Sequence, residues 1–169
     1  MHIKPLLSAR FSGMERNYHI KRVLLLVLAA LPLSMHAEWF QDPDTGCAVW
    51  GDHPQPIVKI HWSGDCVDGK ASGNGLMEVF IDGLPFSTYE GEYRDGKAEG
   101  YGVLNTPGAA RYEGEFKNNN LHGHGAIISP DGKRMEGDYV NGMPDGTVVI
   151  TSPDGTKVEM EFDHGRRVK

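Results

Sequence analysis

Two histidines stand at a spacing that could serve a metal site. His122 and His124 lie two residues apart, which on a β-strand places both side chains on one face. Zinc requires three or four converging ligands, and no further histidine or cysteine stands near enough in the sequence pattern to complete a set. We therefore expect His122 to be a polar, exposed residue, and we expect no metal and no cofactor.

Carboxylates recur in two rows with a period of 23 residues. The rows are Glu90, Glu113, Glu136 and Glu159, and Glu92, Glu115, Asp138 and Glu161. Such rows would suit a Ca²⁺ surface or a pair of carboxylates for acid–base catalysis. A catalytic pair, however, needs two different environments, and repetition makes the environments equal. In three units a cation stands two residues before the first carboxylate: Arg111, Arg134 and Lys157. These cations favour a charge-paired, solvated face.

Other catalytic and nucleotide-binding patterns are incomplete. Gly73-Asn-Gly75, Gly100-Tyr-Gly102 and Gly123-His-Gly125 lack the third glycine of a dinucleotide fingerprint and the Lys-Ser/Thr of a P-loop. No Gly-x-Ser-x-Gly elbow is present. We expect strand glycines here, and a protein that is not an enzyme.

The repeat itself is the strongest signal in the sequence. Tyr89-Glu-Gly-Glu-Tyr93, Tyr112-Glu-Gly-Glu-Phe116, Met135-Glu-Gly-Asp-Tyr139 and Val158-Glu-Met-Glu-Phe162 start 23 residues apart. Each motif alternates in polarity, which predicts a half-buried strand. Asp95-Gly96 or an asparagine cluster follows, which predicts a tight turn. Each unit is therefore predicted to be a β-hairpin, and successive hairpins to form one antiparallel meander.

A longer first unit begins at Trp62. Its glycines have the same internal spacing, and its offset from the next unit is 27 residues. The four extra residues add two to each arm without changing the face of any side chain, with Asp82-Gly83 at the turn. Strand glycines are predicted to make room for aromatic rings from adjacent strands. These rings are predicted to line one face as a candidate binding groove: Trp62, Tyr89, Tyr93, Tyr112, Phe116, Tyr139 and Phe162.

Cys47 and Cys66 frame the segment before the repeats. Cys47–Trp50 and Ile57–Gly64 are predicted to pair as a hairpin, and a bridge between the cysteines would close a loop of about 20 residues. The alternative, a redox pair, usually has the spacing Cys-x-x-Cys, which is absent. We therefore predict a structural disulfide.

The N-terminus has the pattern of a secretory signal peptide. Lys21-Arg22 precedes an 11-residue apolar run, and a small residue, Ala37, stands before the polar change. We predict cleavage after Ala37. The alternatives are an uncleaved anchor and a true start at Met14. From Glu38 onward the chain has 12 Lys and Arg against 22 Asp and Glu, a net charge of −10. This charge argues against nucleic acid and anionic lipid as partners.

The pattern Tyr-x-Gly-x-x-x-x-Gly-x-x-x-Gly-x-Gly resembles the MORN repeat, and residues 89–102 match it at every fixed position. The lead-in from Cys47 to Cys66 resembles that of exported bacterial members of that family. The resemblance implies an elongated, curved sheet that serves as an interaction or scaffold module.

These observations predict an all-β protein with one curved antiparallel meander sheet. Its parts are a signal peptide (1–37), a stapled lead-in hairpin (38–61), repeats (62–88, 89–111, 112–134, 135–157 and a partial 158–165) and a charged tail (166–169). We expect an exported, periplasmic or secreted, non-catalytic module that binds a protein or peptide through the aromatic groove. The alternatives are a membrane-associated module, held by an uncleaved N-terminal segment and contacting lipid, and an unrecognised hydrolase of the cell envelope.

Overall fold

The computed structural model describes residues 38–51 and 58–168. The chain divides into Met1–Ser34 and Met35–Lys169, and the description concerns the second unit. The predicted signal peptide, its cleavage site and the alternative start at Met14 lie outside the described residues. Within those residues, no helix is long and apolar enough to cross a membrane.

The described residues form thirteen strands in one sheet. The strands are β1 (Glu38–Gln41), β2 (Ala48–Gly51), β3 (Val58–Trp62), β4 (Asp65–Val67), β5 (Lys70–Ile81), β6 (Leu84–Arg94), β7 (Lys97–Asn105), β8 (Arg111–Lys117), β9 (Asn120–Ile128), β10 (Arg134–Val140), β11 (Met143–Thr151), β12 (Lys157–Asp163) and β13 (Arg166–Arg167).

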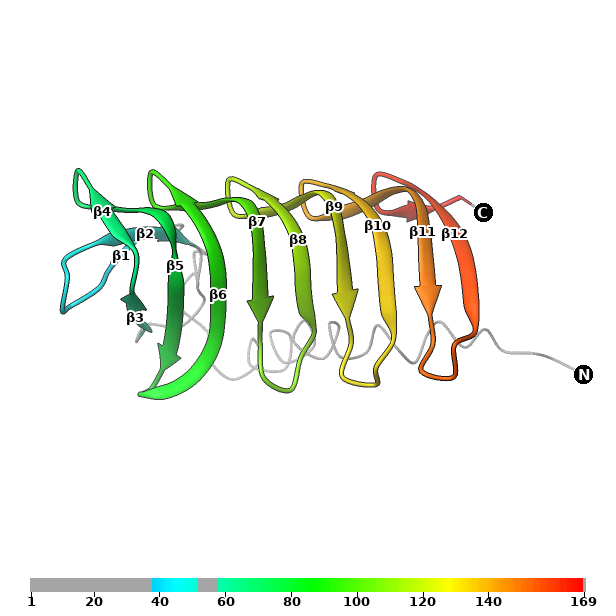
Figure 1. Ribbon diagram of the computed structural model, residues 1–169, viewed down its shortest axis with the longest axis horizontal. Helices are drawn as coiled ribbons and strands as arrows, with labels where there is room; N and C mark the ends of the chain where they lie inside the picture. The colour runs from blue at the N-terminus through cyan, green and yellow to red at the C-terminus, as the bar shows by residue number, and fades with distance from the viewer. Residues whose placement is uncertain (1–37, 52–57, 169) are drawn as a thin grey trace, which may run out of the picture. The chain divides into compact units, whose positions relative to one another are not determined.

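The hairpins follow one another in chain order. From β5 to β12 every strand pairs antiparallel with the next, and Figure 1 shows these strands curved and side by side. The sheet also contains one parallel pairing, between Ala48 of β2 and Lys70 of β5. The prediction of an all-β meander of hairpins is confirmed.

Two-residue turns join the strands at one end of each hairpin. Both turn residues have positive φ, as at Asp95 (51°) and Gly96 (76°). The same geometry occurs at Asp82-Gly83, the turn predicted for the longer first unit, and at Asn118-Asn119. Asp-Gly and Asn-rich pairs suit such turns because glycine, asparagine and aspartate tolerate the left-handed region.

A bulge bends each repeat at its first strand glycine. Gly91 pairs with Gly102, whereas the next residue, Glu92, pairs with Glu99, so two residues of β7 have no counterpart on β6. Gly100 lies in this bulge with a φ of 60°, which explains why glycine is needed there. On the other side of β7 the pairing with β8 is continuous. The curvature therefore arises inside each hairpin, and the hairpins then pair regularly with one another.

The lead-in differs from the sequence prediction in its pairing. Cys47–Trp50 and Ile57–Gly64 were predicted to form a hairpin, but β2 pairs with β1, and β3 pairs with β5. The prediction of that hairpin is wrong. The reason is that β2 lies across the turns of three successive hairpins: Ala48 donates to the Gly69 carbonyl, Trp50 donates to the Gly96 carbonyl, and the Asn119 side chain donates to the Trp50 carbonyl.

Candidate functional site

Six aromatic side chains make a continuous chain of ring contacts inside the curved sheet. The order is Trp62, Tyr93, Tyr89, Phe116, Tyr112 and Tyr139, with ring centroids 4.8 to 5.7 Å apart. All contacts except the first are edge-to-face, with interplanar angles of 85° to 90°. That arrangement places the positive edge of one ring against the negative face of the next. We call these six rings the aromatic row.

Each tyrosine that opens a repeat lies over two glycines. A Cβ placed on Gly102 would lie 2.6 Å from Cζ of Tyr89, and a Cβ on Gly91 would lie 2.8 Å from the same atom. Carbon atoms normally approach no closer than about 3.5 Å, so a side chain at either position would displace the ring. Gly102 confirms the prediction of a glycine that makes room for a ring from the adjacent strand. Gly91 lies on the same strand as the ring, an arrangement that the sequence prediction missed.

One repeat replaces this combination with another. Met135 stands where the other units have Tyr89 or Tyr112, and Val148 stands where they have Gly102 or Gly125. Val148 has no exposed surface and lies against Gly137. Val148, the larger residue at the glycine position, therefore accompanies Met135, a more flexible residue at the tyrosine position. Together they fill the space that the tyrosine ring occupies in the other units.

Burial decides what the predicted groove residues can contact. Trp62, Tyr89, Tyr93, Tyr112, Phe116 and Tyr139 are each 1–5% exposed, and they belong to one core cluster. A single-layer sheet has no second layer to cover its apolar side, and the aromatic row supplies this core itself. Phe162, the seventh predicted residue, is only half-buried and makes no ring contact within the described part of the chain. A partner therefore finds one predicted ring partly accessible, at the C-terminal end of the row.

Three of the four tyrosine hydroxyls in the row donate to backbone carbonyls. Tyr89 donates to Glu92, Tyr112 to Glu115 and Tyr139 to Met135, at 3.0 to 3.2 Å. Burial raises the pKa of Tyr139 to about 12. Burial likewise raises the pKa of Tyr89 and Tyr112 above the ordinary value. These hydroxyls therefore stay protonated at neutral pH, and their role here is structural.

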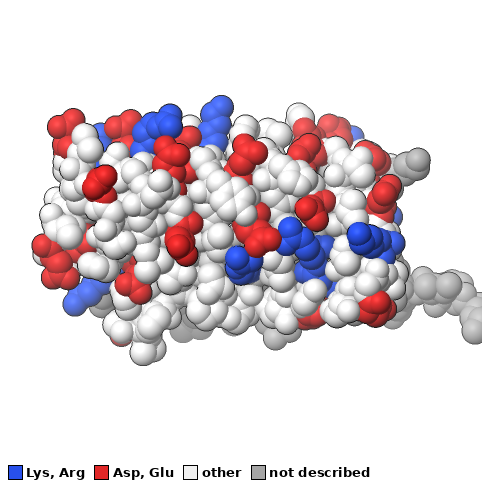
Figure 2. Space-filling model, viewed as in Figure 1, with Lys and Arg blue, Asp and Glu red and all other residues white. Residues whose placement is uncertain are grey.

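The opposite face carries the two acidic rows. Figure 2 shows acidic side chains spread over the visible face, with basic side chains in a group at the upper left and in a row across the middle and right. Arg111 and Arg134 both pair with Glu113, and Arg134 also pairs with Glu136. Hydrogen bonds, first from Arg134 and then from Arg111, lower the pKa of Glu113. The predicted charge pairing is confirmed for the two arginines, whereas the described residues contain no ion pair of Lys157.

The two histidines of the sequence analysis have different surroundings. His124 is exposed and pairs with Asp138, Nδ1 to Oδ1 at 3.0 Å, and with Glu136, Nε2 to Oε1 at 3.6 Å. His122 is half-buried, and its Nδ1 has no hydrogen-bond partner in the part of the chain that the structure describes. The expectation of an exposed His122 is wrong.

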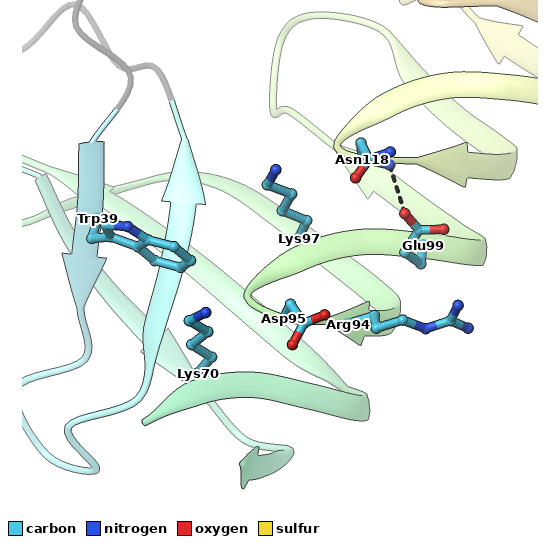
Figure 3. Close-up of a pocket in the computed structure, with 7 residues that line it drawn as sticks. All are labelled: Trp39, Lys70, Arg94, Asp95, Lys97, Glu99 and Asn118. Carbon is cyan, nitrogen blue, oxygen red and sulfur yellow. Dashed lines mark hydrogen bonds between the residues drawn. The ribbon is translucent and has the colours of Figure 1, made fainter. Parts of the chain in front are cut away.

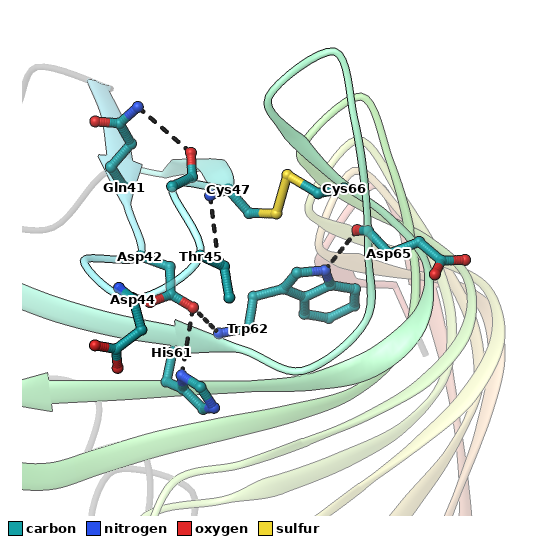
Figure 4. Close-up of a disulfide and its surroundings, with 10 residues drawn as sticks. Gln41, Asp42, Asp44, Thr45, Cys47, His61, Trp62, Asp65 and Cys66 are labelled. Carbon is teal, nitrogen blue, oxygen red and sulfur yellow. Dashed lines mark hydrogen bonds and ion pairs between the residues drawn. A yellow bond between two sulfur atoms is a disulfide. The ribbon is translucent and has the colours of Figure 1, made fainter.

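Figure 4 shows the disulfide that precedes the repeats and the residues around it. Cys47 and Cys66 form the predicted disulfide, with Cα atoms 5.7 Å apart. Beside it the Trp62 indole donates to the Asp65 carbonyl, and the Trp62 backbone N–H donates to the carboxylate of Asp42. Burial works to raise the pKa of Asp42, but the hydrogen bonds, first that from Trp62, outweigh it and lower the pKa. The disulfide thus closes the end of the core at which the aromatic row begins.

Two acidic clusters were not predicted as possible cation sites. One joins Asp42 and Asp44 to His61. The other joins Asp145 of β11 to Asp163 and His164 at the end of β12. Asp42 already accepts hydrogen bonds from Trp62 and Asp44, which is ordinary turn chemistry. The loop sequence Asp42-Pro-Asp44 was the only sequence signal, and nothing else at either cluster points to a ligand.

A small pocket lies beside the hairpin formed by β1 and β2, outside the predicted groove (Figure 3). Its volume is about 250 Å³, and it is lined by Trp39, Lys70, Arg94, Asp95, Lys97, Glu99 and Asn118. The repeated Asp-Gly-Lys at 68–70 and 95–97 was the available sequence signal, because it places a lysine directly after a turn. Trp39 belongs to β1, which is far in sequence from the strands that carry the two lysines. No local sequence pattern predicts that Trp39 lies beside them.

Comparison with known proteins identifies the repeats. The family model described as the MORN repeat matches residues 89–107, 112–134 and 136–157, three adjacent units of the sheet. Repeats of this family are generally non-catalytic binding or scaffold modules, and they often mediate protein or membrane interactions. No curated protein matches the sequence significantly.

Proposed function

Because the chain is a MORN-repeat protein, we propose that it is an exported, non-catalytic module that binds a protein partner. The partner contacts the C-terminal end of the predicted groove, where Phe162 stands at the repeat position of Phe116 and Tyr139 without a ring contact in the described residues. The observation that carries this proposal is the contrast between the two ends of the row. The front end is closed by Trp62 and the disulfide-linked lead-in, whereas Phe162 is half-buried and has no ring on its far side in the described residues.

The incomplete last repeat explains why this end is open. Val158 stands at the position of Tyr89, and Met160 stands where the other units have glycine. Val158 is 47% exposed, whereas Tyr89 is 2% exposed. Repeat arrays need terminal units that cover the last apolar face, and among the described residues the two-residue strand β13 pairs with the end of β12. An apolar side chain from a partner would continue the row and bury Phe162 and Val158.

Export is supported by the N-terminal sequence and by the disulfide. The basic pair, apolar run and Ala37 have the order of a secretory signal. The bridge between Cys47 and Cys66 suits an oxidising compartment. We propose that the module works in the periplasm or outside the cell, with cleavage after Ala37.

Photo-crosslinking in cells tests the interaction surface. A photoreactive residue at Phe162 should capture a protein at a defined mass. The same residue at Glu159 is the matched control, because Glu159 lies on the same strand and belongs to the acidic face. Equal capture from both positions, or capture from neither, would overturn the proposal.

A further inference from the structure

The pocket beside the hairpin formed by β1 and β2 combines two ammonium groups with an exposed indole (Figure 3). Trp39 is 44% exposed. The Lys70 Nζ lies 5.1 Å from the centroid of the Trp39 ring, and the Lys97 Nζ lies 6.0 Å from that of Trp50. The two indoles contact each other edge to face, with centroids 5.2 Å apart. Lysines from two neighbouring hairpins thus reach one aromatic pair.

Arg94, Asp95 and Glu99 also line the pocket, and the described residues contain no ion pair between either carboxylate and Lys70 or Lys97. Arg94 pairs with Glu92, and Glu99 accepts the backbone N–H of Asn118. Neither Lys70 nor Lys97 has a carboxylate within 4.0 Å of its Nζ among the described residues. By contrast, Lys133 pairs with Asp131 at 2.9 Å. On a chain with a net charge of −10 from Glu38 onward, two cations without carboxylate partners beside an exposed indole favour an anionic ligand.

The walls of the pocket are held in place before any ligand binds. The Trp39 ring lies directly on Gly96, where a Cβ would be 2.5 Å from Cζ3. The hairpin that carries Trp39 and Trp50 is hydrogen-bonded to two repeat turns. The Trp50 N–H donates to the Gly96 carbonyl, and the Trp50 carbonyl accepts from the Asn119 side chain. Such preorganisation reduces the entropy that binding costs.

We propose that this pocket binds the C-terminal carboxylate of a peptide, with the last side chain of the peptide against Trp39. The carboxylate lies between Lys70 and Lys97. The volume of about 250 Å³ is below the usual range for a whole small-molecule ligand, about 300–1,000 Å³, and so suits a chain end. The proposal rests on the proposed function as a protein-binding module, and it identifies a second contact.

Indole N–H signals in NMR spectra of the full chain provide the test. The probe is a three-residue peptide ending in phenylalanine, prepared as the free acid and as the C-terminal amide. The acid should shift the signals of Trp39 and Trp50 saturably, while buried Trp62 serves as the internal reference. The amide should bind at least about tenfold more weakly, because it loses the charge-assisted hydrogen bonds.

Substitutions distinguish this pocket from other cations on the surface. Lys70→Gln and Lys97→Gln should each weaken binding of the acid about tenfold. The control Lys157→Gln removes the same charge on β12 and should change nothing. Equal binding of acid and amide, or wild-type binding by Lys97→Gln, would show that no carboxylate site exists. Tighter binding of glucuronate than of the peptide acid would replace the peptide with a sugar acid.

The outcome is separate from that of the proposed function. A partner captured from Phe162 with no peptide binding would end only the pocket proposal. Peptide binding with no capture from Phe162 would end only the proposed use of the aromatic row.

Discussion

Replacing Gly125 by valine should destabilise the protein unless Tyr112 is changed with it. A Cβ at Gly125 would lie 2.6 Å from Cζ of Tyr112, and φ at this glycine is not in the left-handed region. The ring, and not the backbone, therefore excludes a side chain. Overpacking of this kind typically costs about 1–3 kcal/mol, and we expect a loss near the upper end because Tyr112 is buried on both sides by rings.

Tyr112→Met alone should also destabilise the protein. It removes two edge-to-face contacts, each worth about 0.5–1.5 kcal/mol, and the hydrogen bond to the Glu115 carbonyl, worth about 1 kcal/mol. We expect a loss of about 2–4 kcal/mol in the free energy of unfolding. If the two changes were independent, the double variant would lose about 5–7 kcal/mol.

The double variant Tyr112→Met, Gly125→Val should instead lose no more than about 3 kcal/mol. It reproduces the combination that the protein itself uses at Met135 and Val148. Urea denaturation followed by circular dichroism measures the four free energies. The control pairs Tyr112→Met with Gly102→Val, which lies under a different tyrosine, and should show no favourable coupling. Additive losses in the Tyr112–Gly125 cycle would refute the account of why glycines recur in these strands.

Three further predictions concern the lead-in, a turn and a histidine. Reducing the bridge between Cys47 and Cys66 should cost about 3 kcal/mol of stability, because it opens a loop of about 20 residues, and a double Cys→Ala variant should not respond to reductant. Asn119→Gly should cost about 1–2 kcal/mol, because the side chain makes two hydrogen bonds while the turn itself accepts glycine; unchanged hydrogen exchange in β1 and β2 would contradict this. Hydrogen bonding to Asp138 raises the pKa of His124. The resulting stabilisation is present below about pH 6.5 and is lost as pH rises through the raised pKa. Asp138→Asn should therefore lower the pKa of His124 in an NMR titration, and an unchanged midpoint would show that the ion pair is absent in solution.

The local features of the repeat could be predicted from the sequence because they depend on neighbouring residues. Alternation in Tyr112–Lys117 predicts a strand, and Asp95-Gly96 predicts a tight turn. The 23-residue period then fixes the order of the hairpins, since each unit pairs with the next. Even the longer first unit follows from an offset of 27 residues and one Asp-Gly pair.

The exposure of the rings and the position of the lead-in could not be predicted in this way. The aromatic row is buried because a bulge at Gly100 and its equivalents bends each repeat hairpin, and no pattern of polarity reports how far a sheet bends. The lead-in depends on contacts across long separations, such as the hydrogen bond from Asn119 to Trp50. Asn119 stands where the repeat has glycine. Its side chain is needed for the hydrogen bond to Trp50, and the sequence does not indicate that these two residues are neighbours.

Hydrogen exchange of the protein with and without its captured partner tests the central claim most directly. If the partner continues the aromatic row, amides of β12 (Lys157–Asp163) should exchange more slowly in the complex, because their outer edge is paired only at its end. Amides of β8 (Arg111–Lys117), which has a paired strand on each side, should not change. Protection over β8 with unchanged exchange in β12 would contradict the account.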